Sequence, residues 1–342
     1  LNLLARDVVP VVRRTGSIGT ADIGLMGQIG AVLTGVGEAV RSAASAVRML
    51  LATSLTTAGA LGASRDPWKA VAHVGTEREA EIGSWLYRNA MGWDWPNATH
   101  IQDPLSLRMM PQVFGATFDT LLIVGRSILA ATGRTDDNPV VVDNQVLTSG
   151  GSLPLDVTIY LQSAQLALAH VARNSFNRCV LLANGARRDL PINLVPKGAI
   201  ATGFGPIIKL AGELFARALS MSVPVSAQSL VVAAGLEDEA AFLPLVVERF
   251  ERQVRALRRL AALEGLLAAQ AMDIHGDRPS GVPQLIYEKV RTHAAFYKID
   301  RPLSSEVESI ENDLGSEQSM AELISHAPLL ALDEFFALGP VA

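Results

Sequence analysis

Three parts of the sequence carry side chains that can bind a carboxylate or move a proton. Arg108 ends the stretch "IQDPLSLR", and an arginine binds a carboxylate through two parallel N–H bonds that fix its plane. Glu237 and Glu239 belong to an acidic triplet, in which like-charged neighbours and apolar surroundings would raise the pKa of a general acid or base. Asp22 lies in the glycine-rich stretch "GSIGTADIG". These residue types predict acid–base chemistry on a small carboxylate.

Each of these residues also has a structural interpretation that the sequence leaves open. Arg108 could form an ion pair between helices. The acidic triplet lies at the start of a helix predicted over 239–272, where carboxylates complement the helix dipole and cap the free N–H groups of the first turn. Asp22 follows a glycine-rich turn, which is typical of a helix N-cap. A phosphate-binding loop is not indicated, because no Lys-Ser or Lys-Thr pair follows the glycines.

Composition and charge exclude several classes of protein. The formal net charge is −5, so no basic field predicts a nucleic-acid partner or an anionic membrane. Cys179 is the only cysteine, which excludes a disulfide framework and predicts a reducing, cytoplasmic setting. The six histidines form no His-x-His or His-x-x-x-His pair, so we predict no bound metal. No stretch is predicted to span a membrane.

Helical periodicity dominates the sequence. In 239–272, apolar residues recur every three or four positions from Leu243 to Leu267, and Arg and Glu fill much of the rest. Extended runs are few and short, at 8–12 and 138–142. We predict a single all-α domain over 1–342, a bundle of long helices. The other predicted helices are 28–62, 79–90, 109–131, 156–182, 206–220, 283–297 and 318–326.

The apolar content predicts contact with another subunit. Aliphatic and aromatic side chains together with Cys make up 49% of the residues before the 28 glycines are added. The usual content with glycine included is about 45–50%. Such a chain can bury a large core and keep an apolar face for a further copy of itself.

Six separated segments carry a resemblance to a known family. They are "TGSIG…DIG…GVGEA" (15–39), "HIQDPLSLRMMPQVFGA" (100–116), "TDDNPVV" (135–141), "LTSGGS" (147–152), "ATGF" (201–204) and "AAGLEDE" (233–239). In that order the chain resembles the histidine and aromatic amino acid ammonia-lyases and their aminomutase relatives. The resemblance implies a mostly α-helical homotetramer with active sites where several subunits meet. The family's chains also have an N-terminal region before Gly-Ser-x-Gly, so we expect the sequence to be a fragment or to omit residues.

The resemblance also implies a self-made electrophile, methylidene-imidazolone. The family forms it from an Ala-Ser-Gly triad directly after Gly-Ser-x-Gly. The serine Cβ becomes the methylene, and the glycine permits the tight ring because it has no side chain. Here Thr20, Ala21 and Asp22 follow the Gly-Ser-Ile-Gly stretch. We therefore expect no methylidene-imidazolone and no other cofactor.

Other positions match the family's site or depart from it. By the resemblance, Arg108 binds the substrate carboxylate and Glu237 is the family's glutamate. Gln102 and Asn138 match neighbouring site residues. The side chains that surround the ring in the family are replaced by Ala52, Leu105, Leu153, Leu236 and Glu239. These losses are mutually consistent, because buried polar groups without the ring would be unsatisfied.

The site is therefore expected to be a pocket between Asp22, Arg108 and Glu237. Leu105, Leu153 and Leu236 would make its walls more apolar than a histidine substrate requires.

Three functions remain open. The first is an enzyme of specialised metabolism that runs elimination, addition, isomerisation or cyclisation on a small carboxylate or acyl substrate. The second is a catalytically inactive homologue that acts as a binding or scaffold partner. The third is an ordinary aromatic amino acid ammonia-lyase whose modified residue the sequence does not show. Arg108 and Glu237 favour the first over the second, because a scaffold has no need of them.

Overall fold

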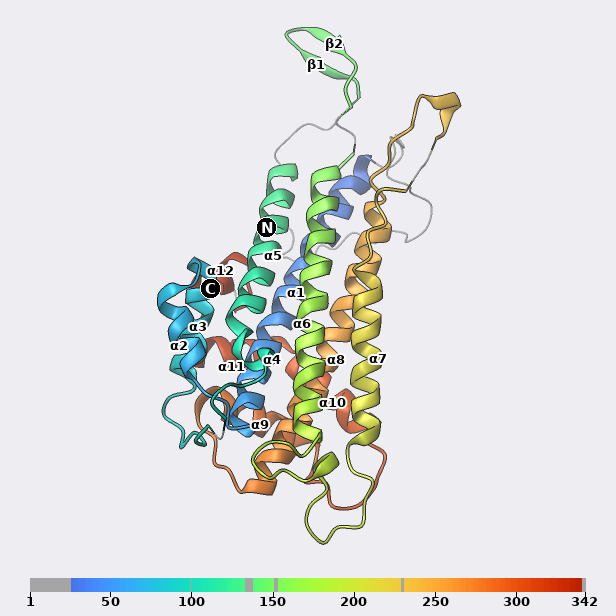
Figure 1. The fold of residues 1–342 in the computed structure, drawn as a ribbon. Coiled ribbons are helices and arrows are strands. Elements are labelled where there is room, and N and C mark those ends of the chain that lie inside the picture. Colours follow the sequence, from blue (N-terminus) through green and yellow to red (C-terminus); the bar gives the residue numbers. More distant parts are fainter. Residues whose placement is uncertain (1–25, 99, 133–137, 151–152, 229–230, 340–342) are drawn as a thin grey trace.

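The computed structural model describes residues 26–98, 100–132, 138–150, 153–228 and 231–339. Figure 1 shows long helices that run side by side, shorter helices against one flank, and a small hairpin beyond one end. The helices are α1 (Met26–Ala60), α2 (Asp66–Val74), α3 (Glu77–Asn89), α4 (Leu105–Arg108), α5 (Met110–Thr132), α6 (Leu155–Ala183), α7 (Gly205–Met221), α8 (Leu243–His275), α9 (Gly281–His293), α10 (Ser304–Leu314), α11 (Glu317–His326) and α12 (Leu330–Phe335). The predicted all-α fold class is confirmed.

The long helices α1, α5, α6, α7 and α8 form the centre of the molecule. Helix α8 packs against α1, α6 and α7, and α5 contacts both α1 and α6. Small residues permit the close approach of these helices. A Cβ on Gly265 of α8 would lie 3.3 Å from the Val290 side chain of α9 and 3.6 Å from that of Thr53 of α1. Alanines are also frequent among the buried residues of α1 and α8.

Helix α8 begins at Leu243, whereas the periodicity predicts a start at 239. Phe242, directly before it, has a left-handed backbone with φ of 49°, and a proline stands in the first turn. Proline is favoured there because the N–H that it lacks would be unpaired at a helix start. The acidic triplet lies outside the helix, whose first turn contains no acidic residue. The interpretation of Glu237 and Glu239 as charges that complement the dipole of this helix is therefore wrong.

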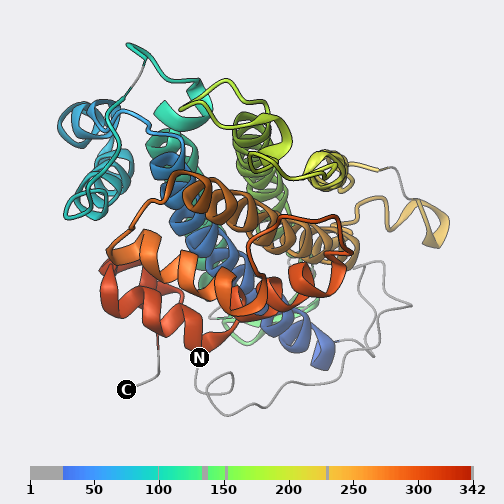
Figure 2. The same cartoon turned by 90° about the horizontal axis from the view of Figure 1, so that it is seen from below.

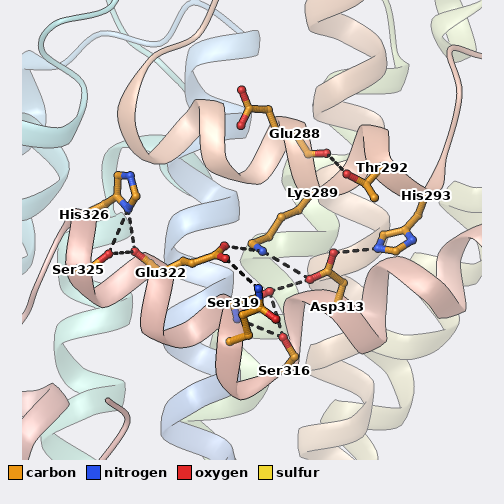
Figure 3. A network of polar contacts seen from close by, with 11 residues as sticks. Glu288, Lys289, Thr292, His293, Asp313, Ser316, Ser319, Glu322, Ser325 and His326 are labelled. Carbon is orange, nitrogen blue, oxygen red and sulfur yellow. Dashed lines mark hydrogen bonds and ion pairs between the residues drawn. The ribbon is translucent and has the colours of Figure 1, made fainter. Parts of the chain in front are cut away.

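Helices α9 to α12 form a layer on one side of the bundle (Figure 2). A polar network joins α9, α10 and α11 (Figure 3). Asp313 accepts a hydrogen bond of 2.7 Å from the Ser319 hydroxyl, and its other carboxylate oxygen lies 2.8 Å from Nε2 of His293. Nζ of Lys289 lies 3.5 Å from Asp313 and 2.7 Å from Glu322. Two side chains of α9, Lys289 and His293, thus hold α10 and α11.

A buried ion pair fixes the end of the chain to the core. Arg48 of α1 and Asp333 of α12 are 0% and 5% exposed, and Nε of Arg48 lies 3.0 Å from the Asp333 carboxylate. The same guanidinium donates to the carbonyl of Ala327, which also accepts a 2.9 Å hydrogen bond from Nε1 of Trp85. The segment after α11 is therefore part of the same folded core as α1 and α3.

Two projecting segments lie at one end of the bundle (Figure 1). One is the antiparallel hairpin of β1 (Val140–Val142) and β2 (Gln145–Leu147). The other is the arm that leads from α7 to α8 and contains the 3-10 helix η4 (Ala233–Gly235). A second 3-10 helix, η3 (Ile192–Leu194), follows α6. The predicted extended run at 138–142 thus becomes β1, and the run at 8–12 lies outside the described residues.

One described helix, α5, is long and apolar enough to cross a membrane by length and composition alone. Half of its most apolar window is buried inside the protein, where α5 packs against α1, α3 and α6. The buried core helix of a soluble protein satisfies the same criteria of length and composition. The observation is therefore weak evidence that α5 spans a membrane.

Candidate functional site

The segment that ends in Arg108 is fixed by side chains from other elements. Helix α4 has a single turn, and the carbonyls at the end of such a helix have no partner within it. The carbonyl of Leu107 accepts a 2.9 Å hydrogen bond from Nε1 of Trp68, which lies in α2. The carbonyl of Ser106 accepts a 3.1 Å hydrogen bond from Nη1 of Arg178, which lies in α6. The backbone around Arg108 is therefore held by two buried donors.

Asp103 fixes the other end of the same segment. Its side chain is almost completely buried and accepts a 2.6 Å hydrogen bond from the backbone N–H of Ser64, just beyond α1. The second carboxylate oxygen pairs with the guanidinium of Arg187, which is also buried and follows α6. A buried charge is stable only when it is paired and hydrogen-bonded. This clasp therefore ties the loop before α4 to α1 and to the end of α6.

Arg108 itself is half-buried and only partly engaged. Its Nε donates a 2.6 Å hydrogen bond to the carbonyl of Asp103. Within the described part of the chain, the two terminal nitrogens of its guanidinium form no hydrogen bond or ion pair. The alternative of an ion pair between helices is therefore not found among these residues. The two free nitrogens are the pair that a carboxylate would use.

Gln102 and Leu105, the predicted neighbours of Arg108, lie on the same segment. Both are exposed, and the Leu105 side chain keeps 55% of its surface accessible. An exposed leucine beside an arginine with unpaired nitrogens is expected where other groups complete a binding site. The described chain by itself does not enclose these two side chains.

The remaining predicted residues lie on or beside the two projecting segments. The side-chain oxygen of Asn138, before β1, accepts a 2.9 Å hydrogen bond from the backbone N–H of Ser149. Leu153 is partly buried just before α6. Leu236 keeps 85% of its surface exposed, and Glu239 is also exposed.

Glu237 is paired through its backbone only. It forms an isolated antiparallel bridge with Val232, with backbone hydrogen bonds of 2.9 and 3.3 Å. Its side chain is partly buried and forms no hydrogen bond or ion pair with another described residue. The glutamate therefore stands next to η4 in the projecting arm, and its carboxylate is unengaged among the described residues.

The chain does not bring Arg108 and Glu237 together. Helix α5 starts two residues after Arg108 and carries the chain about 35 Å, at 1.5 Å per residue, to the end where the hairpin projects. The η4 arm lies at that same end (Figure 1). Arg108 and Glu237 of one chain therefore do not form the expected pocket with Asp22 by themselves, and a pocket that these residues form between copies of the chain stays a prediction. The stretch 16–24, with Thr20, Ala21 and Asp22, lies outside the described residues.

The network of Figure 3 contains the residue types of a hydrolytic triad but not its connectivity. Asp313 stands between Ser319 and His293, so the histidine contacts the carboxylate and not the hydroxyl. A nucleophilic serine needs the imidazole as its direct hydrogen-bond partner. The network is therefore structural. In the described part of the chain, no group of three or more His, Cys, Asp or Glu side chains could hold a metal ion.

The sequence predicts a role for Arg108 but not for the residues that hold its segment in place. These residues are Ser64, Trp68, Asp103, Arg178 and Arg187. Asp103 was detectable, because an aspartate before a proline at the start of a short helix is a recognisable turn pattern. The other residues are far from Arg108 in the sequence. No local pattern connects them to it.

Comparison with known proteins gives the family. A profile described as aromatic amino acid lyase matches residues 42–292. The chain is 29% identical over 266 residues to the histidine ammonia-lyase of Yersinia enterocolitica, an alignment that covers 75% of this chain and 52% of that protein. It is 27% identical over 365 residues to the histidine ammonia-lyase of Stigmatella aurantiaca, which covers 91% of this chain and 72% of that protein. The chain thus spans about half to three quarters of these relatives.

Solved structures share the fold. Histidine ammonia-lyase from Trypanosoma cruzi matches with a TM-score of 0.80 at 20% identity, over 90% of this chain and 60% of that chain. Ergothionase from Treponema denticola, an ergothioneine-degrading enzyme, matches with a TM-score of 0.79 at 23% identity, over 85% and 60%. At these identities the likeness concerns the fold, whereas the profile covers most of the sequence. The chain belongs to the aromatic amino acid lyase family.

Proposed function

We propose that the protein is an ammonia-lyase-like enzyme that binds a small carboxylate substrate through Arg108 and moves a proton with a carboxylate of the acidic triplet. The observation that carries this proposal is the guanidinium of Arg108. Its Nε is tied to Asp103, and its two terminal nitrogens are unengaged within the described chain. Two parallel N–H groups match a carboxylate in geometry and charge.

The proposed chemistry does not use methylidene-imidazolone. Thr20, Ala21 and Asp22 follow Gly-Ser-Ile-Gly, so neither the serine nor the glycine of the precursor triad is present in its place. Leu105, Leu236 and Ala52 stand where the family has polar groups around the ring, by the alignment of the motifs. The residues present do not fit the prosthetic group, and we derive no step through it.

Glu237 and Glu239 are the proposed proton-transfer groups. A carboxylate that removes a proton next to a bound carboxylate, or returns one, would support elimination, addition, isomerisation or cyclisation. Glu237 suits this role because its backbone is fixed by the bridge to Val232 while its side chain is unengaged in the described chain. Asp22 is the further candidate, by its place in the sequence.

We further propose that several copies of the chain complete the site. Arg108 and Glu237 stand toward opposite ends of the bundle, so a site that uses both needs at least two copies. Exposed apolar side chains on α5 and α6 are the surface that we propose for this association. They include Ile123, Leu129, Ile159, Tyr160 and Leu166.

A second candidate is an ordinary histidine ammonia-lyase, and the names of the relatives favour it. Two measurements separate the candidates. Ammonia release is assayed with L-histidine, L-phenylalanine and L-tyrosine, and the mass of the intact protein is compared with that of the sequence. We expect no ammonia release and no loss of two waters. Robust release together with that mass loss would establish the ordinary lyase.

Carboxylate recognition is tested separately by binding. L-histidine is compared with histamine, and L-phenylalanine with phenethylamine, because each pair differs only in the carboxylate. We expect the amino acid of at least one pair to bind more tightly. Equal affinities in every pair would leave Arg108 without the proposed role and would favour a scaffold.

The prosthetic group is not expected to return on simple replacement of its precursor. Rewriting Thr20-Ala21 as Ala-Ser-Gly supplies the atoms of the triad but not the polar surroundings. Each lost oxyanion-type donor costs about 2.7–4 kcal/mol of barrier, and several are missing by the motif alignment. We expect the rewritten protein to release no ammonia from the three amino acids. Measurable release would show that the surroundings are adequate after all.

A further inference from the structure

A charged pair lies at the centre of the bundle, completely shielded from solvent. Arg178 of α6 and Glu264 of α8 are both 0% exposed. Nε of Arg178 donates a 2.6 Å hydrogen bond to one carboxylate oxygen of Glu264, and Nη2 donates a 3.1 Å hydrogen bond to the other. The hydroxyl of Ser175 donates a further 2.6 Å hydrogen bond to the same carboxylate. The carboxylate is thus satisfied by α6 alone.

The guanidinium also reaches two further elements. Nη2 donates a 2.5 Å hydrogen bond to the hydroxyl of Ser54 in α1, and Nη1 donates a 3.1 Å hydrogen bond to the carbonyl of Ser106 in α4. One side chain of α6 therefore contacts α1, α4 and α8 at once. A planar guanidinium with five N–H donors can make these bonds together, whereas an ammonium group presents a single nitrogen.

Stability alone does not explain such a pair. Burying two charges is costly, and replacing a buried pair with apolar residues of similar volume is often neutral or stabilising. An apolar pair could not, however, donate to the carbonyl of Ser106, two residues before Arg108. That carbonyl belongs to a single-turn helix and has no partner within it. Nη1 of Arg178 thus supplies the hydrogen bond to the Ser106 carbonyl, which only a buried donor at this position can supply.

We propose that Arg178 is a positioning residue for Arg108. Arg178, itself fixed by Glu264, holds the backbone of α4 and so sets the place from which the Arg108 guanidinium meets a carboxylate. Trp68 holds the next carbonyl, of Leu107, in the same way. This inference deepens the proposed function and rests on it for the role of Arg108. The effect on the backbone of α4 does not depend on any ligand.

The test compares Arg178→Lys with Arg48→Lys. Arg48 is a matched control, because it is also completely buried, pairs with a carboxylate and donates to a backbone carbonyl, but its carbonyl is that of Ala327. Lysine keeps the charge at each site but presents one nitrogen in place of the three of the guanidinium, so it cannot reach all the acceptors together. Amide hydrogen exchange is measured on the peptide that covers 104–109. The affinities for L-histidine and histamine, and for L-phenylalanine and phenethylamine, are measured on the same samples.

We expect exchange in 104–109 to become about tenfold faster in Arg178→Lys, as when a hydrogen bond that holds a locally opening segment is lost. We expect no change there in Arg48→Lys. In the pair that the wild-type protein distinguishes, the preference for the amino acid over the amine should shrink in Arg178→Lys and stay unchanged in Arg48→Lys. A general loss of stability would not produce this difference. Unchanged exchange in Arg178→Lys, or an equal increase in both variants, would overturn the inference.

A second variant keeps the test decisive if Arg178→Lys does not fold. The double replacement Arg178→Met with Glu264→Leu removes both charges together, which leaves no unpaired charge in the core. Ser54 keeps a hydrogen-bond partner, because its hydroxyl also donates a 2.6 Å hydrogen bond to the carbonyl of Leu50. The same acceleration in 104–109 is expected, and its absence contradicts the inference. If the wild-type protein shows no preference for the carboxylate, the proposed function fails, and the exchange data alone decide the positioning role.

Discussion

The guanidinium of Arg108 is anchored through one nitrogen, and its other two nitrogens have no partner among the described residues. An arginine that is fixed before it meets its ligand loses less conformational freedom on binding, because the cost of ordering the side chain has already been met in folding. The bond from Nε to the Asp103 carbonyl provides this anchoring. A bound carboxylate would therefore gain nearly the full value of the charged hydrogen bonds.

Replacing Arg108 with leucine tests this arrangement. We expect Arg108→Leu to weaken binding of a carboxylate ligand by about 1.5–3 kcal/mol, the usual value of a hydrogen bond to a charged group. The affinity for the matching amine should not fall. Arg126→Leu, at an exposed arginine of α5, is the control. Unchanged affinity in Arg108→Leu, measured by calorimetry, would reject the assignment.

Glu237 and Glu239 are separated by a test of turnover. If Glu237 moves the proton, Glu237→Gln should lower turnover by roughly 10²–10⁴-fold, the range for general acid–base catalysis. Asp238→Asn is the control on the same segment. A normal rate in Glu237→Gln with an inactive Glu239→Gln would move the role to Glu239. Normal rates in both would remove the acidic triplet from the mechanism.

For single residues, the sequence predicted those that we propose to contact the ligand, but not the residues that hold them in place. Arg108 stands in a recognisable motif, and the structure leaves it available. Arg178 and Trp68 were not predictable, because their relation to α4 arises from helix packing between positions far apart in the chain. Even Asp103, within the motif, shows its function only through its contact with Arg187.

Among the elements, α9, α10 and α11 are joined by charged side chains. Burial would raise the pKa of Asp313, but hydrogen bonds from Ser319 and His293 and the charge of Lys289 outweigh it and lower the pKa. The hydrogen bond from Lys289 is the main cause that lowers the pKa of Glu322. A carboxyl group whose pKa is lowered by folding stabilises the protein above its unfolded pKa. This contribution is lost as the pH falls through the folded value.

We therefore expect the free energy of unfolding to decrease from about pH 5 to about pH 3, across the ordinary pKa range of unfolded carboxyl groups. Replacing Lys289 with methionine should make this decrease smaller, because both lowered pKa values depend in part on its charge. Urea unfolding at several pH values measures the effect. An identical pH dependence in Lys289→Met and the wild type would contradict the assignment.

The long helices and three shorter ones, α3, α9 and α11, were predicted from the sequence, whereas α2, α4, α10 and α12 were not. Periodic apolar positions over many turns define α1, α5, α6, α7 and α8 with ends that differ by a few residues. Helices α2, α4 and α12 are too short for such a pattern to stand out, and α10 was missed although it is one residue longer than the predicted α11. The start of α8 was misjudged because Ala240 and Ala241 continue the apolar pattern, whereas the left-handed Phe242 interrupts the helix. The proline that follows is the feature that would have corrected the prediction.

At the scale of the whole molecule, we expect a homotetramer in solution. The exposed apolar residues of α5 and α6 and the separation of the candidate site residues both favour association. Sedimentation at micromolar concentration measures the assembly, and Leu166→Glu, at a side chain 54% exposed on α6, should weaken it. A monomer of the unaltered chain would contradict this prediction.

The distance between Arg108 and the η4 arm has a consequence for mixtures of variant subunits. If each working site takes its arginine from one copy and its glutamate from another, two variants that are each inactive can restore activity when they form a mixed oligomer. Arg108→Leu and Glu237→Gln subunits, unfolded and reassembled as a mixture, would place both intact groups together in about a quarter of the sites of a randomly mixed symmetric oligomer. Each variant alone would have none. Activity recovered on mixing would therefore distinguish a site shared between chains from one contained in a single chain.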